Sequence, residues 1–463
     1  MKLTGFLFAA ALLGACTQPA AEENYTRHVD PKIGTGGHGH VFVGANVPFG
    51  LVQVGPTSIP QTWDWCSGYH ASDSTVIGFS HTHLSGTGIG DLFDITVMPV
   101  VGEVTYARGE ENDPASGLWS YADRTREITK PGYYSVPLVR YGITAELTAT
   151  ERVGLHRYTF PASDAAAVVF DLENGGCWDK ATDTGFRFSD DSTRIAGWRC
   201  STGWAKNQEV YFVAEFSKPA KGISYLQPGE IDDSKMPRIV ARYARVDFDT
   251  AEGEQVLVKV ALSPVSIEGA KANLAAELSG WDFDATAKAA DKAWNAELSK
   301  VKIETADETA RRIFYTALYH TMIAPSLFCD VNGDYYGSDH AIHRNADFTN
   351  YTTFSLWDTY RAAMPLMTVL HPEKMADIAK SYMDTWAKFD FLLIIAGMEE
   401  TDGTESISHG VEGYIFFQTG TFSFPVTPFC LKFLNVGTVA EHDTAQIAGG
   451  EGGNNISVKS VLI

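Results

Sequence analysis

Residues 255–263 read QVLVKVALS, and this alternating stretch decides the fold class of the N-terminal half. In an extended chain every second side chain points to one face, which here carries Val256, Val258, Val260 and Leu262. Residues 209–217, EVYFVAEFS, repeat the pattern, and similar short runs recur between Gly, Pro, Asn and Asp from about Val29 to Ser266. Many short strands without intervening helices predict an antiparallel β-sandwich over residues 25–266.

The hydrophobic period changes after Pro264. Residues 268–280 and 284–300 are Ala-rich with helical spacing and predict a helical linker over 267–304. In the second helix Asp284 is the expected N-cap, and one side carries Ala287, Ala290, Trp294 and Leu298.

Further helices are expected in the next part of the chain, one over 308–325 and another beginning around Ser355. They predict the start of an all-α domain over 305–380. Beyond about Lys380 neither helical period nor strand alternation is sustained, so 381–463 is expected to be a divergent tail without an assigned fold.

The sequence of 463 residues carries a formal net charge of −21 and contains 44% hydrophobic residues. Such a protein buries a large core and repels the phosphates of nucleic acid and of anionic membranes. A neutral partner such as a sugar carries no such penalty, and aromatic side chains are well suited to it.

Residues 1–24 carry one Lys, a short apolar run and then Leu13-Gly14-Ala15-Cys16. This pattern is typical of a bacterial lipoprotein signal, with Cys16 as the acylated residue. The alternative is an ordinary secretory signal. The prediction is a protein of the bacterial cell envelope, periplasmic or surface-exposed, that meets the membrane only through its N-terminal lipid.

The other five cysteines are widely and irregularly spaced, and this spacing does not indicate a disulfide framework. Cys177 and Cys200 flank a hairpin-like segment, so they either form a disulfide or remain buried thiols.

The stretch from Ile33 to Gly50, IGTGGHGHVFVGANVPFG, contains the G-x-G-x-x-G spacing of a dinucleotide-binding turn. That turn needs a helix directly after it, and the following residues are extended in character, which excludes the nucleotide interpretation. What remains is a glycine-rich loop that carries His38 and His40.

A second histidine pair, His81 and His83, lies in GFSHTHLSGTG, residues 78–88. Two histidines separated by one residue in an extended segment place both rings on one face, where they offer metal ligands or hydrogen-bonding groups to a polar ligand. The alternative is that loop histidines satisfy buried backbone groups. Trp63, in TWDWCSGYH (62–70), is either a stacking face for a sugar or part of the core.

Two further segments have structural alternatives. DVNGD, residues 330–334, spaces oxygen ligands as a calcium loop does but lacks the required Gly and Glu, so a tight turn is expected. In YTTFSLWDTYRAAMPL (351–366), Asp358 fits either a capping box with Ser355 or a polar cluster with Trp357 and Arg361.

Several of these segments together resemble glycoside hydrolase family 92, the calcium-dependent exo-acting α-mannosidases. The matching segments are VDPKIGTGGHGHVFVGANVPFGLVQVGP (29–56), CSGYH (66–70), GFSHTHLSGTG (78–88), FYTALYHTMIAPSLFCDVNGDYYG (314–337) and YTTFSLWDTYRAAMPL (351–366). The resemblance implies a β-sandwich, a helical linker and an (α/α)₆ toroid, with mannose bound between the domains, Ca²⁺ as cofactor, and inversion at the sugar carbon between two carboxyl groups.

The resemblance also implies site residues. Trp357, Asp358 and Arg361 match the family's Trp-Asp-Thr-Tyr-Arg segment at the terminal-mannose site. The loops that carry His38, His40, Trp63, His81 and His83 match sandwich segments that complete the pocket.

The family's acid and base segments, Glu-Gly-x-x-Trp-Gln-Tyr and Gly-Asn-Asp-Asp-x-Gly-Gln-Met-Ser-Ala-Trp-Tyr, do not occur in this sequence, and the quoted matches stop near Lys380. The catalytic pair, the calcium ligands and the linkage cleaved therefore stay unassigned. We expect a C-terminally truncated or frame-disrupted reading frame with poor solubility and no mannosidase turnover. The alternatives are a non-catalytic carbohydrate-binding remnant and a metallohydrolase centred on His81 and His83.

Overall fold

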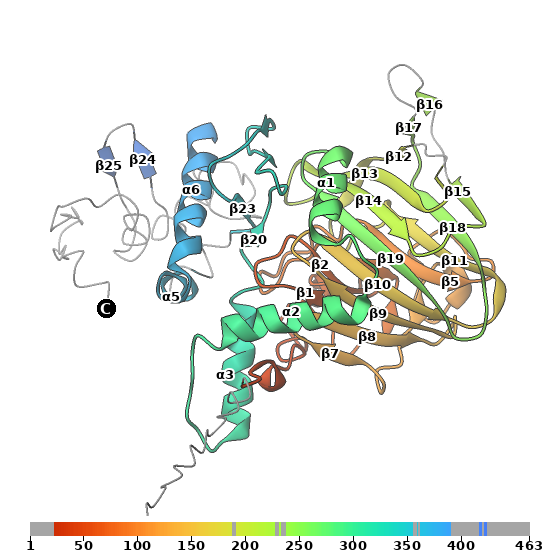
Figure 1. The fold of residues 1–463 in the computed structure, drawn as a ribbon, viewed down its shortest axis with the longest axis horizontal. Helices are drawn as coiled ribbons and strands as arrows, with labels where there is room; N and C mark the ends of the chain where they lie inside the picture. The colour runs from red at the N-terminus through yellow and green to blue at the C-terminus, as the bar shows by residue number, and fades with distance from the viewer. Residues whose placement is uncertain are drawn as a thin grey trace, which may run out of the picture.

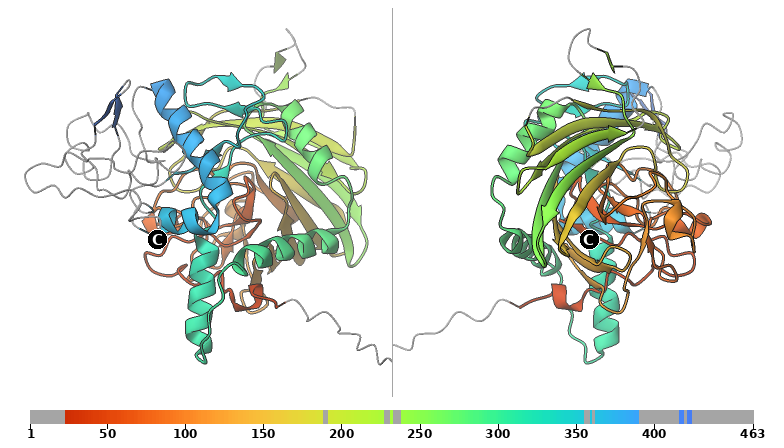
Figure 2. Two further views of the ribbon diagram at one scale, coloured as in Figure 1. Left: turned by 60° about the vertical axis from the view of Figure 1, so that its left-hand side comes forward. Right: turned by 90° about the vertical axis from the view of Figure 1, so that its right-hand side faces the viewer.

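The computed structural model describes residues 23–187, 191–226, 231–232, 238–354, 359, 362–389, 416–418 and 421–423. Two antiparallel sheets face each other in the N-terminal half, and helices follow them along one side (Figures 1 and 2). Residues 1–22, with the expected signal and Cys16, lie outside the described residues.

The first sheet has seven strands in the order β1-β2-β4-β5-β11-β18-β15. Their bounds are Ala45–Asn46, Gln53–Thr57, Gly78–Ser80, Thr96–Val101, Ser163–Asp171, Tyr243–Thr250 and Gly222–Leu226. The glycine-rich loop leads into β1, and no helix follows it, which confirms that the nucleotide interpretation was rightly excluded.

The second sheet has ten strands in the order β16-β17-β12-β13-β14-β19-β10-β9-β8-β7. Their bounds are Ile231–Asp232, Arg238–Ile239, Lys180–Arg187, Arg194–Thr202, Gln208–Phe216, Glu254–Ser263, Val153–Phe160, Ile143–Ala149, Tyr133–Leu138 and Ile128–Lys130. In β19, the opening stretch of the sequence, Val258 pairs with His156 of β10 and with Phe216 of β14.

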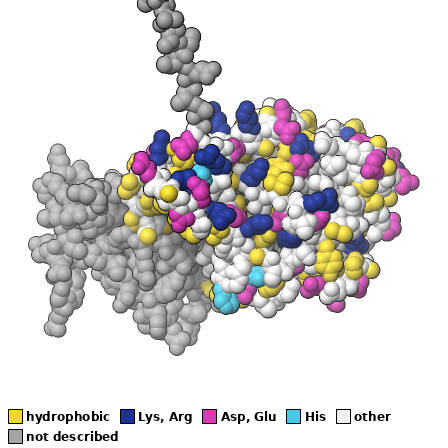
Figure 3. All heavy atoms as spheres, turned by 90° about the horizontal axis from the view of Figure 1, so that it is seen from below, with side chains coloured by type: hydrophobic (Ala, Val, Ile, Leu, Met, Phe, Trp, Pro, Cys, Tyr) yellow, Lys and Arg dark blue, Asp and Glu magenta, His cyan; other side chains and the backbone are white. Residues whose placement is uncertain are grey.

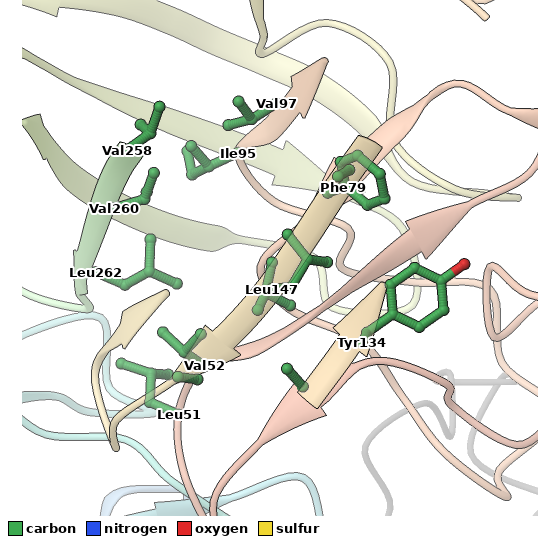
Figure 4. Close-up of a cluster of buried hydrophobic side chains, with 14 of the residues drawn as sticks. Leu51, Val52, Phe79, Ile95, Val97, Tyr134, Leu147, Val258, Val260 and Leu262 are labelled. Carbon is green, nitrogen blue, oxygen red and sulfur yellow. The ribbon is translucent and has the colours of Figure 1, made fainter. Parts of the chain in front are cut away.

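The core lies between the two sheets. Val256, Val258, Val260 and Leu262 of β19 are fully buried there, as the alternation predicts. Figure 4 shows three of them facing Val52, Ile95 and Val97 of the opposite layer. The same continuous core extends through Trp294 and Tyr319 to the later helices, so the sandwich and the helices share one hydrophobic interior.

Two helices follow the sandwich, α1 (Ile267–Glu277) and α2 (Phe283–Leu298). The expected N-cap of α2 was wrong: Asp282, not Asp284, accepts a hydrogen bond from the backbone N–H of Ala285. Phe283 is buried at the first helical position, which moves the helix start two residues earlier. Trp294 of α2 is buried and donates to the carbonyl of Asn46 over 2.7 Å.

Helix α1 covers the outer face of the ten-stranded sheet along β19 and β14. On this face Lys259 is buried, and its ammonium lies 4.0 Å from the Trp281 ring centroid. The last residues of β19 are therefore buried on both faces, although their sequence alternates.

The helical part contains α3 (Glu308–His320), α5 (Ala363–Leu370) and α6 (Pro372–Phe389). Helix α3 ends at His320, five residues before the expected end at Pro325, and α6 runs past Lys380, where the sequence pattern was expected to fail. Of the helix expected from Ser355, residues 355–358, 360 and 361 lie outside the described residues, and the later part is α5.

Short elements fill the loops. They are η1 (Thr26–His28), η2 (Trp63–Trp65), η3 (Pro114–Ser116) and the strand pairs β3 (Thr75–Val76) with β6 (Ser120–Tyr121), β20 (Ser326–Leu327) with β23 (Tyr351–Thr352), β21 (Tyr335–Tyr336) with β22 (Ile342–His343), and β24 (Phe416–Gln418) with β25 (Thr421–Ser423).

Cys66, Cys177, Cys200 and Cys329 are free thiols, so the disulfide considered for Cys177 and Cys200 is not formed. In the part of the chain that the structure describes, no helix combines the length and apolar character needed to cross a bilayer. Acidic and basic side chains are interspersed on the face seen in Figure 3.

Candidate functional site

A pocket lies where the sandwich meets the segment 326–354 and helix α6. It consists of two hollows of about 260 and 240 Å³ that share Gln208, Phe328, Thr352 and Thr353. These volumes fall just below the range of about 300–1,000 Å³ that is usual for small-molecule sites, which suits a single sugar unit better than a long chain.

The segment 326–354 is held against the sandwich by polar contacts. The Tyr336 hydroxyl donates to Glu209 over 3.2 Å, and the side-chain amide of Asn207 donates to the same hydroxyl over 3.0 Å. Strand β20 is also tied to Phe49, whose carbonyl accepts from the N–H of Leu327 over 2.9 Å. These bonds position Phe328 and Thr352 over the end of β14.

Three side chains that line the smaller hollow carry buried acceptors without a partner. They are Gln53 Oε1, His83 Nε2 and Asp91 Oδ1. His83 Nδ1 lies 2.8 Å from the carbonyl of Gln53 and must carry the proton, which leaves a lone pair on Nε2. Gln53 donates its amide to the carbonyl of Ile323, which leaves its oxygen free. These three acceptor atoms suit a ligand that donates hydrogen bonds, such as a molecule with hydroxyl groups.

The electrostatics of these groups follow from burial. Burial lowers the pKa of His83 to about 3, so its imidazole stays neutral between Phe42 and Phe93. Burial likewise raises the pKa of Asp91, although the backbone N–H of Ala205 donates to its carboxylate and opposes the shift.

Behind Asp91 lies a buried ion cluster. The guanidinium of Arg199 donates to Asp94 over 2.7 Å and to Asp179 over 2.5 Å, and all three side chains are almost fully buried. Burial raises the pKa of Asp179 to about 6. The cluster fixes the ends of β12 and β13 beneath the pocket.

His81 lies in the sandwich core, away from the pocket lining. Its Nδ1 contacts the carbonyl of Ile95 at 2.6 Å and its Nε2 contacts His156 at 2.9 Å, so both ring nitrogens are occupied. The expectation that His81 and His83 share one ligand face is therefore wrong: the backbone turns after β4, and the two rings take different partners. His81 follows the structural alternative for loop histidines.

His38, His40 and Trp63 form a separate surface cluster with Asp64. Asp64 Oδ1 lies 2.6 Å from His38 Nδ1 and 3.2 Å from His40 Nε2. The Trp63 ring centroid lies 4.2 Å from that of His40, and half of the Trp63 side chain is exposed. The structure thus brings together three of the sequence-predicted residues.

Trp357, Asp358 and Arg361 lie outside the described residues. Thr353 and Phe354, the last described residues before them, line the pocket. Sequence reasoning missed Gln53, Asp91 and Gln208, and it did not select Asp64 although the residue stands in a quoted motif. A lone polar residue in a loop or at a strand end carries no periodic signal.

The calcium ion implied by the family resemblance is not accounted for by the histidine cluster. In the part of the chain that the structure describes, His38, His40 and Asp64 are the one group of His, Cys, Asp or Glu side chains that brings three ligand atoms together, and two of these atoms are nitrogen, whereas Ca²⁺ takes oxygen ligands. In the 330–334 loop the N–H of Gly333 donates to the carbonyl of Asp330 over 2.9 Å, which confirms the predicted tight turn. The Asp330 carboxylate accepts hydrogen bonds from Ser263 and Asn273.

The sequence matches two family models. The glycosyl hydrolase family 92 N-terminal domain matches residues 28–263, and the family 92 catalytic domain matches residues 269–409. The second match continues past Lys380, where the quoted segments were expected to end the resemblance.

Solved structures give the same result. A family GH92 α-mannosidase from Bacteroides thetaiotaomicron superposes with a TM-score of 0.75 and 38% identity, covering 79% of this chain and 50% of that one. The same enzyme is also known in complex with mannoimidazole. An inverting GH92 mannosidase of that species gives a TM-score of 0.69 and 25% identity, with 86% and 53% covered.

A curated relative, an uncharacterised secreted glycosidase of Arthroderma benhamiae, is 24% identical over 343 residues, which is 67% of this chain and 43% of the relative. The chain thus spans about half the length of the proteins it matches. The predicted fold class, a sandwich followed by the first helices of the toroid, is confirmed. With a family model matched over more than half of its residues, the chain belongs to glycosyl hydrolase family 92.

Proposed function

We propose that this chain belongs to an exo-acting α-mannosidase that removes terminal α-linked mannose from N-glycans or mannans with inversion. The pocket between the sandwich and the segment 326–354 carries the proposal. Its buried free acceptors, Gln53 Oε1, His83 Nε2 and Asp91 Oδ1, suit sugar hydroxyls. The α-mannosidases among the similar structures support mannose as the sugar.

In this proposal Trp357, Asp358 and Arg361, which come shortly after Thr353 in the sequence, hold the terminal mannose. Inversion requires two carboxyl groups about 6.5–9.5 Å apart, one protonating the leaving oxygen and one activating water. The role of the chain's own described residues is to bind and orient. The neutral imidazole of His83 accepts a hydrogen bond from a sugar hydroxyl at Nε2 and adds no charge to the pocket.

Calorimetric titration of the full chain with methyl α-mannoside tests the sugar site. We expect saturable binding that Gln208→Ala weakens by about tenfold, the loss of one or two hydrogen bonds. Gln255→Ala, at an exposed position of β19, is the matched control and should bind as the wild type does. Equal binding by the two variants, or equal affinity for methyl α-glucoside, would contradict the proposal.

A second candidate is a carbohydrate-binding protein without turnover, favoured by the free acceptors Gln53 Oε1, His83 Nε2 and Asp91 Oδ1, which suit the binding of hydroxyl groups. Release of mannose from an α-mannoside, followed by NMR of the new anomer, separates the two. Binding together with mannose release that starts as the β-anomer supports the enzyme. Binding alone supports the carbohydrate-binding protein.

We further propose export to the cell envelope with a lipid on Cys16; the description of the fungal relative as secreted supports export. Labelled palmitate should be incorporated by the wild type and by Cys329→Ser, but not by Cys16→Ser. Incorporation by Cys16→Ser would refute the anchor.

A further inference from the structure

The surface cluster of His38, His40 and Asp64 is built from two separate segments. The histidines lie on the glycine-rich loop, and Asp64 lies in η2. His38 Nδ1, His40 Nε2 and a carboxylate oxygen of Asp64 all lie within 4.8 Å of one another. In the parts of the chain that the structure describes, this is the one group of three or more such ligand atoms.

The position of His40 is fixed before any ligand arrives. Its backbone has φ 53°, in the left-handed region that a residue with a side chain seldom adopts. Its carbonyl accepts from the Ser67 hydroxyl over 2.5 Å and from the N–H of Gly86 over 2.7 Å. Backbone strain held in place by hydrogen bonds is common where a side chain must keep one orientation.

Trp63 completes the arrangement from the side of η2. Its indole N–H donates to the carbonyl of Gly88 over 2.7 Å, while its ring packs 4.2 Å from the His40 ring. The neighbouring Asp64 is thereby held toward both imidazoles. His40 is 7% exposed, whereas the His38 side chain is 77% exposed, so the cluster opens to solvent at one side only.

The spacing of the ligand atoms fits a small divalent ion. Zinc binds nitrogen and oxygen at about 2.0–2.2 Å, so two ligand atoms around one tetrahedral ion stand about 3.3–3.6 Å apart. Asp64 Oδ1 lies 2.6 and 3.2 Å from the two imidazole nitrogens, so these atoms must separate by about 1 Å or less to admit the ion. Two imidazoles and one carboxylate select zinc, cobalt or nickel over calcium or magnesium.

We propose that His38, His40 and Asp64 bind one divalent transition-metal ion of the zinc class. The ion joins the glycine-rich loop to η2 and keeps an open coordination position on the solvent side, beside the half-exposed face of Trp63. The proposal does not depend on mannosidase activity, and it concerns an ion other than calcium.

The test uses the full chain without a histidine tag, freed of metal by a chelator, and titrated with Co²⁺ and Zn²⁺ by absorption spectroscopy and calorimetry. We expect one ion per chain, and no competition from Ca²⁺. His38→Ala and Asp64→Asn should each weaken binding by about tenfold or more. His343→Ala is the matched control, because His343 also contacts a carboxylate, Asp339 at 3.0 Å, and should leave the affinity unchanged.

Asp64→Asn keeps the size of the side chain and a hydrogen-bond acceptor, so the variant is expected to fold. Circular dichroism checks its fold, and calorimetry measures its metal affinity separately. Quenching of Trp fluorescence by Co²⁺ should disappear in Trp63→Phe, whereas calorimetric binding persists. The proposal is overturned if no saturable binding is found, if a folded Asp64→Asn and His38→Ala bind as tightly as the wild type, or if the cobalt spectrum shows thiolate ligation, which would place the ion on a cysteine.

Discussion

Replacing the buried residue Arg199 should strongly lower the stability of the fold. It lies on β13 with no exposed surface and donates to Asp94, to Asp179 and to the carbonyl of Leu172. Arg199→Met keeps most of the volume but leaves two buried carboxylates without their counter-charge. Removing one partner of a buried ion pair costs about 3–5 kcal/mol, since the remaining charge stays away from water.

The loss of stability in Arg199→Met should be larger at high pH than at low pH. The pKa of Asp179 is raised to about 6 in the folded protein, from 3.8 for a free aspartate. A raised carboxyl pKa means that the folded state binds the proton more tightly, so stability is gained as pH falls from about 6 toward 3.8 and lost as pH rises. Without Arg199 this effect grows, because protonation is then the main way to relieve the buried charge.

Equilibrium urea unfolding, followed by circular dichroism of the sheets, measures the effect. We expect Arg199→Met to lose about 3–5 kcal/mol near pH 8, and clearly less near pH 5. Adding Asp94→Asn and Asp179→Asn to the variant should restore part of the loss. A loss below about 1 kcal/mol near pH 8, or an equal loss at both pH values, would refute the reasoning.

Three further changes address other parts of the fold. Burial lowers the pKa of His81 to about 4 and that of His83 to about 3, so their contribution to stability is present above about pH 6.5 and lost as pH falls. The advantage of wild type over His81→Gln in urea unfolding should therefore shrink between about pH 6.5 and 4, by up to about 3 kcal/mol. Trp294→Phe leaves the Asn46 carbonyl without its donor and should cost about 1–3 kcal/mol in the same assay. Asp330→Ala removes the carboxylate that joins α1 to the end of β19 and should cost about 1.5–3 kcal/mol.

Two of these predictions have a control at an exposed position. Trp178→Phe and Asp347→Ala should both unfold as the wild type does. If the exposed changes destabilise as much as the buried ones, burial is not the cause of the loss.

The strands and helices could be predicted because their patterns are local. The alternation in 255–263 gave the buried face of β19, and the helical spacing of Ala290, Trp294 and Leu298 gave the buried face of α2. Element ends were less certain. The N-cap of α2 depends on which of two nearby aspartates meets a free N–H, and Phe283 decided this by packing into the core.

The candidate site could be predicted only where a motif marks it. The histidine pairs and Trp63 stand out in the sequence, and the pair His38 and His40 does converge with Asp64. His81 and His83 share the same spacing but separate, because one ring enters the core and the other lines the pocket. Gln53, Asp91 and Gln208 are single polar residues on three different segments, so nothing in the local sequence connects them.

The sequence by itself determined the fold class, the order of sandwich and helices, and the family, because alternation, helical period and motif order are properties of the linear polypeptide. Only the tertiary structure decided which polar groups meet. Arg199 and its two carboxylates are up to 105 residues apart, and the pocket is closed by β14 and the segment 326–354. Such contacts form when strands and loops that are distant in the sequence pack against each other, so the spacing of residues along the sequence does not predict them.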